Sequence, residues 1–326
     1  GAVTTGIYNT LIGGLAGDAI TTGDSNTAVG YSSLTANTTG SRNAAFGRQA
    51  LKANTTGLYN TAVGSLSLEA NTTASNSTAV GYQALTANTT GHENSALGRN
   101  SLAANTTGQH NTGTGDSVLA STTTGSYNTA FGSAALYNNT TASNNTAVGY
   151  SVLLTNTTGS ENTGLGHNAL YGTTTGTGNT GIGQGALQTN TTGATNTAVG
   201  QGSLALNTTA SNNSAFGKNA LASNTTGTNN VALGALAGDA ITTASNNVAI
   251  GAHALTTDTL GSGSIAIGRQ ALQTQNFTSA TTSYNVAVGD QAGLSVTTGV
   301  NNTLIGGLAG DAITTASNNT AVGYQS

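Results

Sequence analysis

The residues best suited to acid–base or metal chemistry are few in this chain and dispersed along it. The 326 residues include ten acidic residues, four histidines and no cysteine. The histidines lie far apart, at His92, His110, His167 and His253. None is spaced with an aspartate or glutamate as metal-binding pairs are, and no thiol is present to act as nucleophile or ligand. We therefore predict that the chain is not an enzyme and holds no metal or cofactor.

Asn-Thr-Thr triplets carry the second kind of chemistry that the sequence offers. Each triplet matches the acceptor pattern for N-linked glycans. A stacked column of asparagines is also suited to a ladder of side-chain amide hydrogen bonds. We predict the ladder and keep glycosylation as the alternative. Both concern ten residues: Asn37, Asn54, Asn71, Asn88, Asn105, Asn139, Asn156, Asn190, Asn207 and Asn224.

A seventeen-residue repeat positions these side chains. The motif Asn-Thr-Ala-Val-Gly recurs with its glycine at Gly13, Gly30 and so on to Gly323, always at this period except for one longer step, from Gly268 to Gly289. We number the places of the repeat so that the asparagine is position 1 and this glycine is position 5. Nineteen copies in strict register indicate a repeat protein rather than a disordered, low-complexity chain.

The length of the repeat predicts an all-β fold, a parallel β-solenoid. Seventeen residues suit one coil of short strands and tight turns, and they are too few for a helical pair or a propeller blade. The Thr-Ala-Val segment of positions 2 to 4 favours a strand. The glycine at position 5 is predicted to form a corner with positive φ, and the small residue at position 15 a second corner.

Paired substitutions between coils indicate what fills the interior. Position 9 is leucine in most coils but glycine in four: Gly17, Gly238, Gly293 and Gly310. In the same four coils, the asparagine at position 12 becomes aliphatic: Ile20, Ile241, Val296 and Ile313. Close-packed interiors conserve volume in this way. We infer that positions 9 and 12 share one core space.

The repeat unit Asn-[Ser/Thr]-Ala-[Val/Ile]-Gly-x-x-[Ser/Ala]-Leu resembles the head repeat of trimeric autotransporter adhesins. It is also similar to repeats of phage-tail-fibre-like and other extracellular fibre proteins. The resemblance covers essentially the whole chain and implies a left-handed β-roll, a homotrimer and a place outside the cell, on a cell or virion surface. The adhesin coil is shorter, and the extra residues here surround positions 12 to 14.

These observations predict one solenoid array over residues 1–326, acting as a structural rod about 90 Å long at about 4.8 Å a coil. Residues 9–22 recur identically at 302–315, which predicts that the array continues beyond both ends as part of a longer fibre. The expected partner is the chain itself, with a host surface or glycan as a further possibility. A net charge of −4 and scattered basic residues exclude a nucleic-acid groove, and no apolar stretch is long enough for membrane insertion.

Position 3 is the predicted subunit interface. It is alanine in fourteen coils, glycine in three and leucine in two. If position 4 faces the core, strand alternation turns this small-residue row outward, where it would suit close contact in a trimer. The competing interpretation is a flattened coil with position 3 inside and position 4 at the interface. The interface residues named by the first interpretation are Ala28, Ala62, Ala79, Ala130, Ala147, Ala198 and Ala249.

Three further features have alternative explanations. The threonine rows at positions 13 and 14 could bind ice, or simply cap neighbouring backbone. The tyrosines at positions 6, 10 and 17 could form an aromatic strip for glycan or surface contact, or shield corner backbone. The one longer coil, with its bulge of four extra residues within Gln273–Tyr284, is the place where a ligand-specific loop would project.

Overall fold

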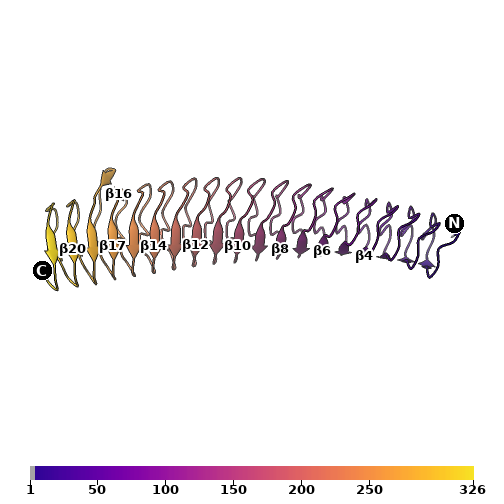
Figure 1. Ribbon diagram of the computed structural model, residues 1–326, viewed down its shortest axis with the longest axis horizontal. Helices are drawn as coiled ribbons and strands as arrows, with labels where there is room; N and C mark the ends of the chain where they lie inside the picture. The colour runs from indigo at the N-terminus through magenta and orange to yellow at the C-terminus, as the bar shows by residue number, and fades with distance from the viewer. Residues whose placement is uncertain (1–3) are drawn as a thin grey trace. The chain divides into compact units, whose positions relative to one another are not determined.

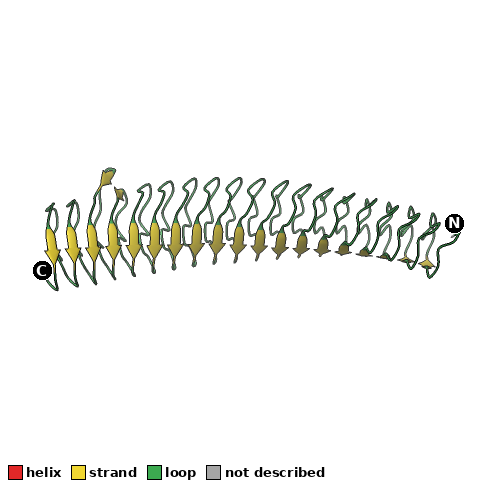
Figure 2. Cartoon of the chain, in the orientation of Figure 1, coloured by secondary structure: helices red, strands yellow, loops and turns green. Residues whose placement is uncertain are grey.

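The computed structural model describes residues 4–326, which form 21 short parallel strands and no helix. The chain divides into two compact units, Gly1–Glu161 (unit 1) and Asn162–Ser326 (unit 2). In each unit the strands stack on one side of the coils, and turns and loops make up the rest (Figures 1 and 2). The prediction of an all-β parallel solenoid is confirmed.

The described residues of unit 1 contain nine strands of three residues, and each pairs in parallel with its neighbouring strands within the unit. The partner of Thr27 is Ala44, for example, and the partner of Ala44 is Thr61. Positions 2, 3 and 4 of one coil therefore lie beside the same positions of the next. The strands are β1 (Thr10–Ile12), β2 (Thr27–Val29), β3 (Ala44–Phe46), β4 (Thr61–Val63), β5 (Thr78–Val80), β6 (Ser95–Leu97), β7 (Thr112–Thr114), β8 (Thr129–Phe131) and β9 (Thr146–Val148).

Unit 2 repeats this arrangement and adds a second, two-stranded sheet at the longer coil. The strands of its main sheet are β10 (Thr163–Leu165), β11 (Thr180–Ile182), β12 (Thr197–Val199), β13 (Ser214–Phe216), β14 (Val231–Leu233), β15 (Val248–Ile250), β17 (Ile265–Ile267), β19 (Val286–Val288), β20 (Thr303–Ile305) and β21 (Thr320–Val322). The small sheet pairs β16 (Gly261–Ser262) with β18 (Thr281–Thr282) and projects beyond the neighbouring coils in Figure 1.

Glycine is required at position 5 because the coils meet there. Gly30 has a φ of +135°, and a Cβ atom on it would lie 2.5 Å from the carbonyl oxygen of Gly47 in the next coil. A side chain would thus be strained by the backbone angle and would collide with backbone. The predicted positive φ at this corner is confirmed.

Other residues than glycine also take positive φ in every coil, at positions 7, 9 and 17. In one stretch of unit 1 they are Asn76 (60°), Gln83 (56°) and Leu85 (51°). Such conformations cost on the order of 1 kcal/mol each and persist where the surroundings enforce them. Here each strained residue donates its backbone N–H to an adjacent coil, Gln83 to Ser65 and Leu85 to Ser101. Stacking therefore holds a turn that a single coil would not keep.

Positions 3, 8, 9 and 12 supply most of the core, and the predicted sharing of space by positions 9 and 12 is confirmed. A Cβ atom on Gly238 would lie 3.1 Å from Cδ1 of Ile241, and one on Gly310 would lie 3.1 Å from Cδ1 of Ile313. The isoleucine therefore fills the volume that the leucine of an ordinary coil occupies.

Candidate functional surfaces

Position 12 forms the predicted asparagine ladder inside the coils. Asn54 Nδ2 donates to Asn37 Oδ1 at 2.8 Å, and Asn71 Nδ2 donates to Asn54 Oδ1 at 2.7 Å. Each amide also donates to the carbonyl oxygen of position 15 in its own coil, as Asn54 does to Gly57 at 3.1 Å. All ten asparagines predicted for this ladder are completely buried. A glycan on any of them would have to be attached before the coil closes.

The ladder stops where position 12 changes residue type. Asn105 is followed by Thr122 and Asn224 by Ile241, and the Oδ1 atoms of Asn105 and Asn224 are left without a hydrogen-bond donor. A buried acceptor without a partner is destabilising. The ladder thus consists of runs, each with one unsatisfied end.

A second asparagine ladder, at position 1, is a feature that the sequence analysis missed. The backbone N–H of Asn60 donates to Asn43 Oδ1 at 3.0 Å, and Asn60 Nδ2 donates to the carbonyl oxygen of Ala74 at 2.8 Å. The carbonyl oxygen at position 15 therefore accepts from both ladders, as Gly57 does from Asn43 and Asn54. The available signal was the recurrence of asparagine at position 1 in all coils except those of Ser77 and Ser264.

The predicted interface row at position 3 lies inside the coil, so that prediction is wrong. The side chains of Ala28, Ala62, Ala79, Ala130, Ala147, Ala198 and Ala249 are at most 1% exposed in the single chain. The position-9 side chain already occupies the interior opposite this part of the strand, so only a methyl group fits at position 3. In a coil with glycine at position 3 even a methyl group would be crowded, since a Cβ atom on Gly181 would lie 3.0 Å from Cγ of Leu170. Strand alternation then turns positions 2 and 4 outward.

A further paired substitution marked position 3 as internal. Leucine replaces the small residue there only at Leu11 and Leu304, in the two coils that carry Gly17 and Gly310 at position 9. A Cβ atom on Gly17 would lie 2.6 Å from Cδ2 of Leu11. The larger residue at position 3 therefore compensates for the missing leucine at position 9.

Positions 2 and 4 form what we call the outer face of the sheet. No charged residue occurs at either position in any of the nineteen coils. Large apolar side chains at position 4 are substantially exposed: Leu97 and Leu233 at 50%, Leu165 at 45% and Phe131 at 42%. In four consecutive main-sheet strands of unit 2 the position-2 threonine is also replaced by an aliphatic residue, at Val231, Val248, Ile265 and Val286. A continuous apolar surface of this kind is typical of an interface.

The threonine rows at positions 13 and 14 have different environments. At position 13 the hydroxyl group bonds to the next coil, as Thr38 Oγ1 does to the carbonyl oxygen of Thr55 at 3.2 Å. The threonines at position 14, such as Thr39 and Thr90, are exposed. Position 13 therefore caps neighbouring backbone, and only position 14 contributes an outward row at this corner.

Position 17 of unit 1 carries planar and charged side chains that stack from coil to coil. The Arg42 guanidinium lies 5.1 Å from the ring centroid of Tyr59 and donates from Nη1 to its hydroxyl group. The rings of His110 and Tyr127 stack with centroids 4.8 Å apart. His110 Nδ1 also lies 3.0 Å from Glu93 Oε2. The sequence did not predict this pair, because the two residues are seventeen positions apart and meet only as members of one column in successive coils.

The longer coil turns inward at Phe277, which is only 4% exposed. It covers Asp258, which occupies the ladder position and is completely buried. Asp258 accepts hydrogen bonds from Gln275 Nε2 at 2.5 Å and from the backbone N–H of Gly261 at 2.9 Å. Burial raises the pKa of this carboxyl group, and the hydrogen bonds only partly offset the effect.

Residues 4–326 contain no group of three or more potential metal-ligating side chains. They also contain no helix long and apolar enough to cross a membrane. No protein-family model matches the sequence, and no curated protein matches it significantly.

Proposed function

We propose that the chain is a structural segment of an extracellular fibre that associates with copies of itself through the outer face of its sheet. The observation that carries the proposal is the uncharged, partly apolar surface at positions 2 and 4. It leaves side chains such as Leu97 and Leu233 half exposed in the single chain. Burial of apolar area is the main driving force for association between folded chains.

Repetition makes this surface suitable for self-association. Copies of one chain share the same period, so their outer rows match coil for coil when they lie side by side. Each coil contributes only a small area, and the contact becomes stable by extending over many coils. Sheets that pack face to face lie about 10 Å apart, a spacing that valine, leucine and phenylalanine side chains fill.

The resemblance to adhesin head repeats supplies the number of chains and the location. It favours a homotrimer on a cell or virion surface. The contribution of the chain is mechanical, since hydrogen bonds between coils run along each unit through the strands, the turns and the two asparagine ladders. We assign it no catalytic role.

Sedimentation velocity of paired variants tests the proposal. The double variant Leu97→Glu/Leu233→Glu places one charge on the outer face of each unit, whereas Thr90→Glu/Thr226→Glu places the same charges at exposed position 14. We expect the native chain and the position-14 control to sediment as oligomers and the outer-face variant to dissociate. Circular dichroism establishes that both variants remain folded. An unchanged oligomer of the outer-face variant, or a native monomer of 31.6 kDa at all concentrations, refutes the proposal.

Ice binding is the second candidate, and one observation favours it. In unit 1, hydroxyl side chains form an unbroken outward row at position 2 of β4 to β9, from Thr61 to Thr146 with Ser95 among them. Their regular spacing of about 4.8 Å along the stack resembles the spacing of an ordered lattice. Thermal hysteresis of the folded chain tests this candidate. A freezing gap that Thr112→Lys abolishes would support it, and no gap in concentrated solution would exclude it.

A further inference from the structure

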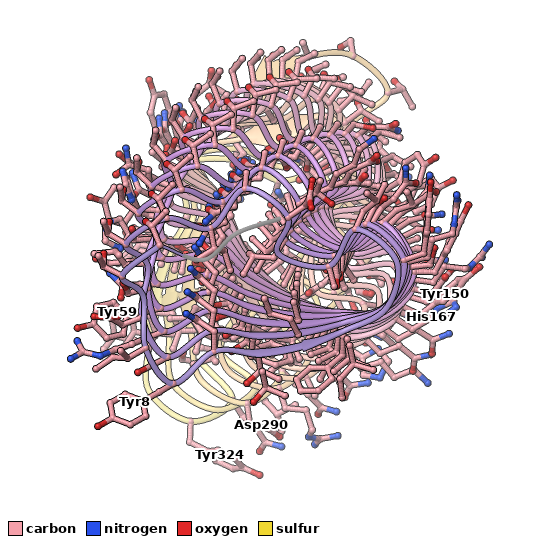
Figure 3. All side chains as sticks on the ribbon, turned by 90° about the vertical axis from the view of Figure 1, so that its right-hand side faces the viewer. Tyr8, Tyr59, Tyr150, His167, Asp290 and Tyr324 are labelled. Atoms are coloured by element: carbon pink, nitrogen blue, oxygen red, sulfur yellow. The ribbon has the colours of Figure 1, made fainter. Side chains whose placement is uncertain are left out.

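A cleft in unit 1 lies outside the proposed self-association surface. It has a volume of about 410 Å³ and is bounded by Ile7 and Tyr8 at one end and by Leu58 and Tyr59 at the other. Three coils separate the two tyrosines, or about 14 Å. In Figure 3 both rings project outward on the same side of unit 1, whereas Tyr150, from position 6, projects on the opposite side.

Small and charged residues of the two intervening coils line the cleft between the tyrosines, among them Asp24 and Arg42. Asp24 Oδ1 accepts a hydrogen bond from the backbone N–H of Ile7 at 2.8 Å, which holds the carboxylate in place. Arg42 is held by its contacts with Tyr59. The guanidinium has five N–H donors, so several remain for a ligand. The cleft therefore combines aromatic faces at its ends with a fixed acceptor and a fixed donor between them.

We propose that this cleft binds a linear, extended polysaccharide that runs along the stack of coils. A pyranose ring has an apolar face of C–H groups, which packs on tyrosine rings, and an edge of hydroxyl groups, which a carboxylate and a guanidinium bind by charge-assisted hydrogen bonds. The carboxylate disfavours a polyanion such as a phosphodiester chain. A sugar unit of an extended chain is about as long as one coil is high, so successive sugars meet equivalent places on successive coils.

The same column provides a second stacking position. Tyr127 lies four coils beyond Tyr59, about 19 Å along the stack, and is braced by His110 as Tyr59 is braced by Arg42. A planar group in the preceding coil holds each ring in a fixed orientation, which lowers the entropy lost on binding. A longer glycan would therefore bind more tightly by reaching both rings.

Titration with cellohexaose, an extended glucan fragment, tests the proposal, with the coiled isomer maltohexaose as the comparison. We expect the NMR spectrum of the native chain to report binding of cellohexaose in the millimolar range or tighter, and weaker binding of maltohexaose. Tyr59→Ala removes one stacking face and should weaken binding about tenfold. Tyr82→Ala is the matched control, because Tyr82 is 50% exposed against 49% for Tyr59 but lies at position 6. Asp24→Asn should weaken binding while leaving the stacking ring in place.

Three results would overturn the proposal: no binding of cellohexaose, equal binding of both hexasaccharides, or equal losses in Tyr59→Ala and Tyr82→Ala. Circular dichroism of the variants verifies folding, which is expected to persist because both tyrosine side chains are exposed. Oligomeric state is measured separately by sedimentation, so failure of this proposal and failure of the proposed self-association are distinguishable.

Discussion

The regular coils of unit 1 and the coils beside the insertion of unit 2 satisfy the buried polar groups at position 12 in different ways. From Asn37 to Asn105, identical amides bond to one another. Each amide after Asn37 donates both to the preceding asparagine and to the carbonyl oxygen of position 15 in its own coil. Around Asp258, an aspartate and a glutamine take the place of two such amides. The Gln275 amide donates to Asp258 Oδ2 and to Ser264 Oγ, and its Oε1 accepts from Asn285 Nδ2.

The difference shows what repetition contributes to this fold. In a run of asparagines every side chain is both donor and acceptor, so the ladder can extend by any number of coils. A single change of residue type requires new partners from other positions, together with Phe277 as a cover. The coil that precedes the longer one therefore carries a buried carboxyl group, Asp258, at the position where the regular ladder has an amide. Substitutions that separate the two arrangements test this account.

The largest effect is expected where the regular ladder is cut in the middle. Asn71→Ala removes the donor to Asn54 Oδ1 and the acceptor for Asn88 Nδ2, and should destabilise unit 1 by about 2–3 kcal/mol. Asn105→Ala is the matched control, because Asn105 Oδ1 has no donor to lose, and should cost about 1–2 kcal/mol. Denaturant unfolding measures both. Equal losses of unfolding free energy in the two variants would mean that hydrogen bonds between neighbouring asparagines do not stabilise the unit.

Asp258→Asn restores the regular ladder residue at position 12 of the coil that precedes the longer one. Because burial raises the pKa of Asp258 in the folded chain, folding is favoured while this carboxyl group is protonated. Stability is lost as the pH rises through the window between its ordinary and its raised pKa. At neutral pH the asparagine variant should be more stable by on the order of 1 kcal/mol. The gain should vanish below the ordinary pKa of aspartate. A gain independent of pH would contradict this explanation.

A smaller effect on stability is expected at position 7, where a residue other than glycine has a positive φ. Gln83→Gly relieves a side chain at φ 56° and should stabilise the chain by about 0.5 kcal/mol, whereas Gln83→Ala should change nothing. Gln270, in the longer coil, has φ 61°, but its Oε1 accepts from Gln291 Nε2 and Arg269 Nη1. Gln270→Gly should therefore gain less. Thermal unfolding compares the variants, and a loss at Gln83 would contradict the strain assignment.

The smallest effect on stability is expected for the ion pairs at position 6. These pairs have similar geometry whether or not the longer coil separates the partners in sequence. Arg99 meets Asp116 of the next coil at 2.8 Å, and Arg269 meets Asp290 at 2.9 Å although the longer coil separates them in sequence. A hydrogen bond from Arg99 lowers the pKa of Asp116. The contribution is therefore present above the ordinary aspartate pKa and lost as the pH falls through the lowered one. Both pairs are exposed, so Arg99→Ala and Arg269→Ala should shift the melting temperature equally little, and added salt should remove even that. A large shift in either variant would be inconsistent with exposed pairs.

Much of this structure could be predicted because the repeat allows equivalent positions of different coils to be compared within one sequence. The period of the repeat predicted the stacked coils, and the exchange of leucine at position 9 for a larger residue at position 12 identified a shared core space. The asparagine triplets indicated a ladder whose amides are now seen to bond from coil to coil. In each case the evidence was a regularity between coils and required no knowledge of a single side-chain contact.

The orientation of the strand was predicted wrongly because size was taken as a sign of burial. Valine and phenylalanine at position 4 were assigned to the core and alanine at position 3 to the surface, whereas the leucine at position 9 leaves room for little more than a methyl group. The side-chain pairs were missed for another reason. Glu93 and His110 are distant in sequence but share a column, and only a search along columns would have paired them.

Oxidative footprinting of the phenylalanines in the native, assembled chain tests the central claim most directly. Of the four phenylalanines, Phe46, Phe131 and Phe216 lie on the outer face and are 41–42% exposed in the single chain, whereas Phe277 is buried. If the outer face joins copies of the chain, the three outer phenylalanines should be as unreactive as Phe277, while Tyr82 and Tyr150 at position 6 are oxidised. Reaction of the three at the level expected for an exposed side chain would contradict the account.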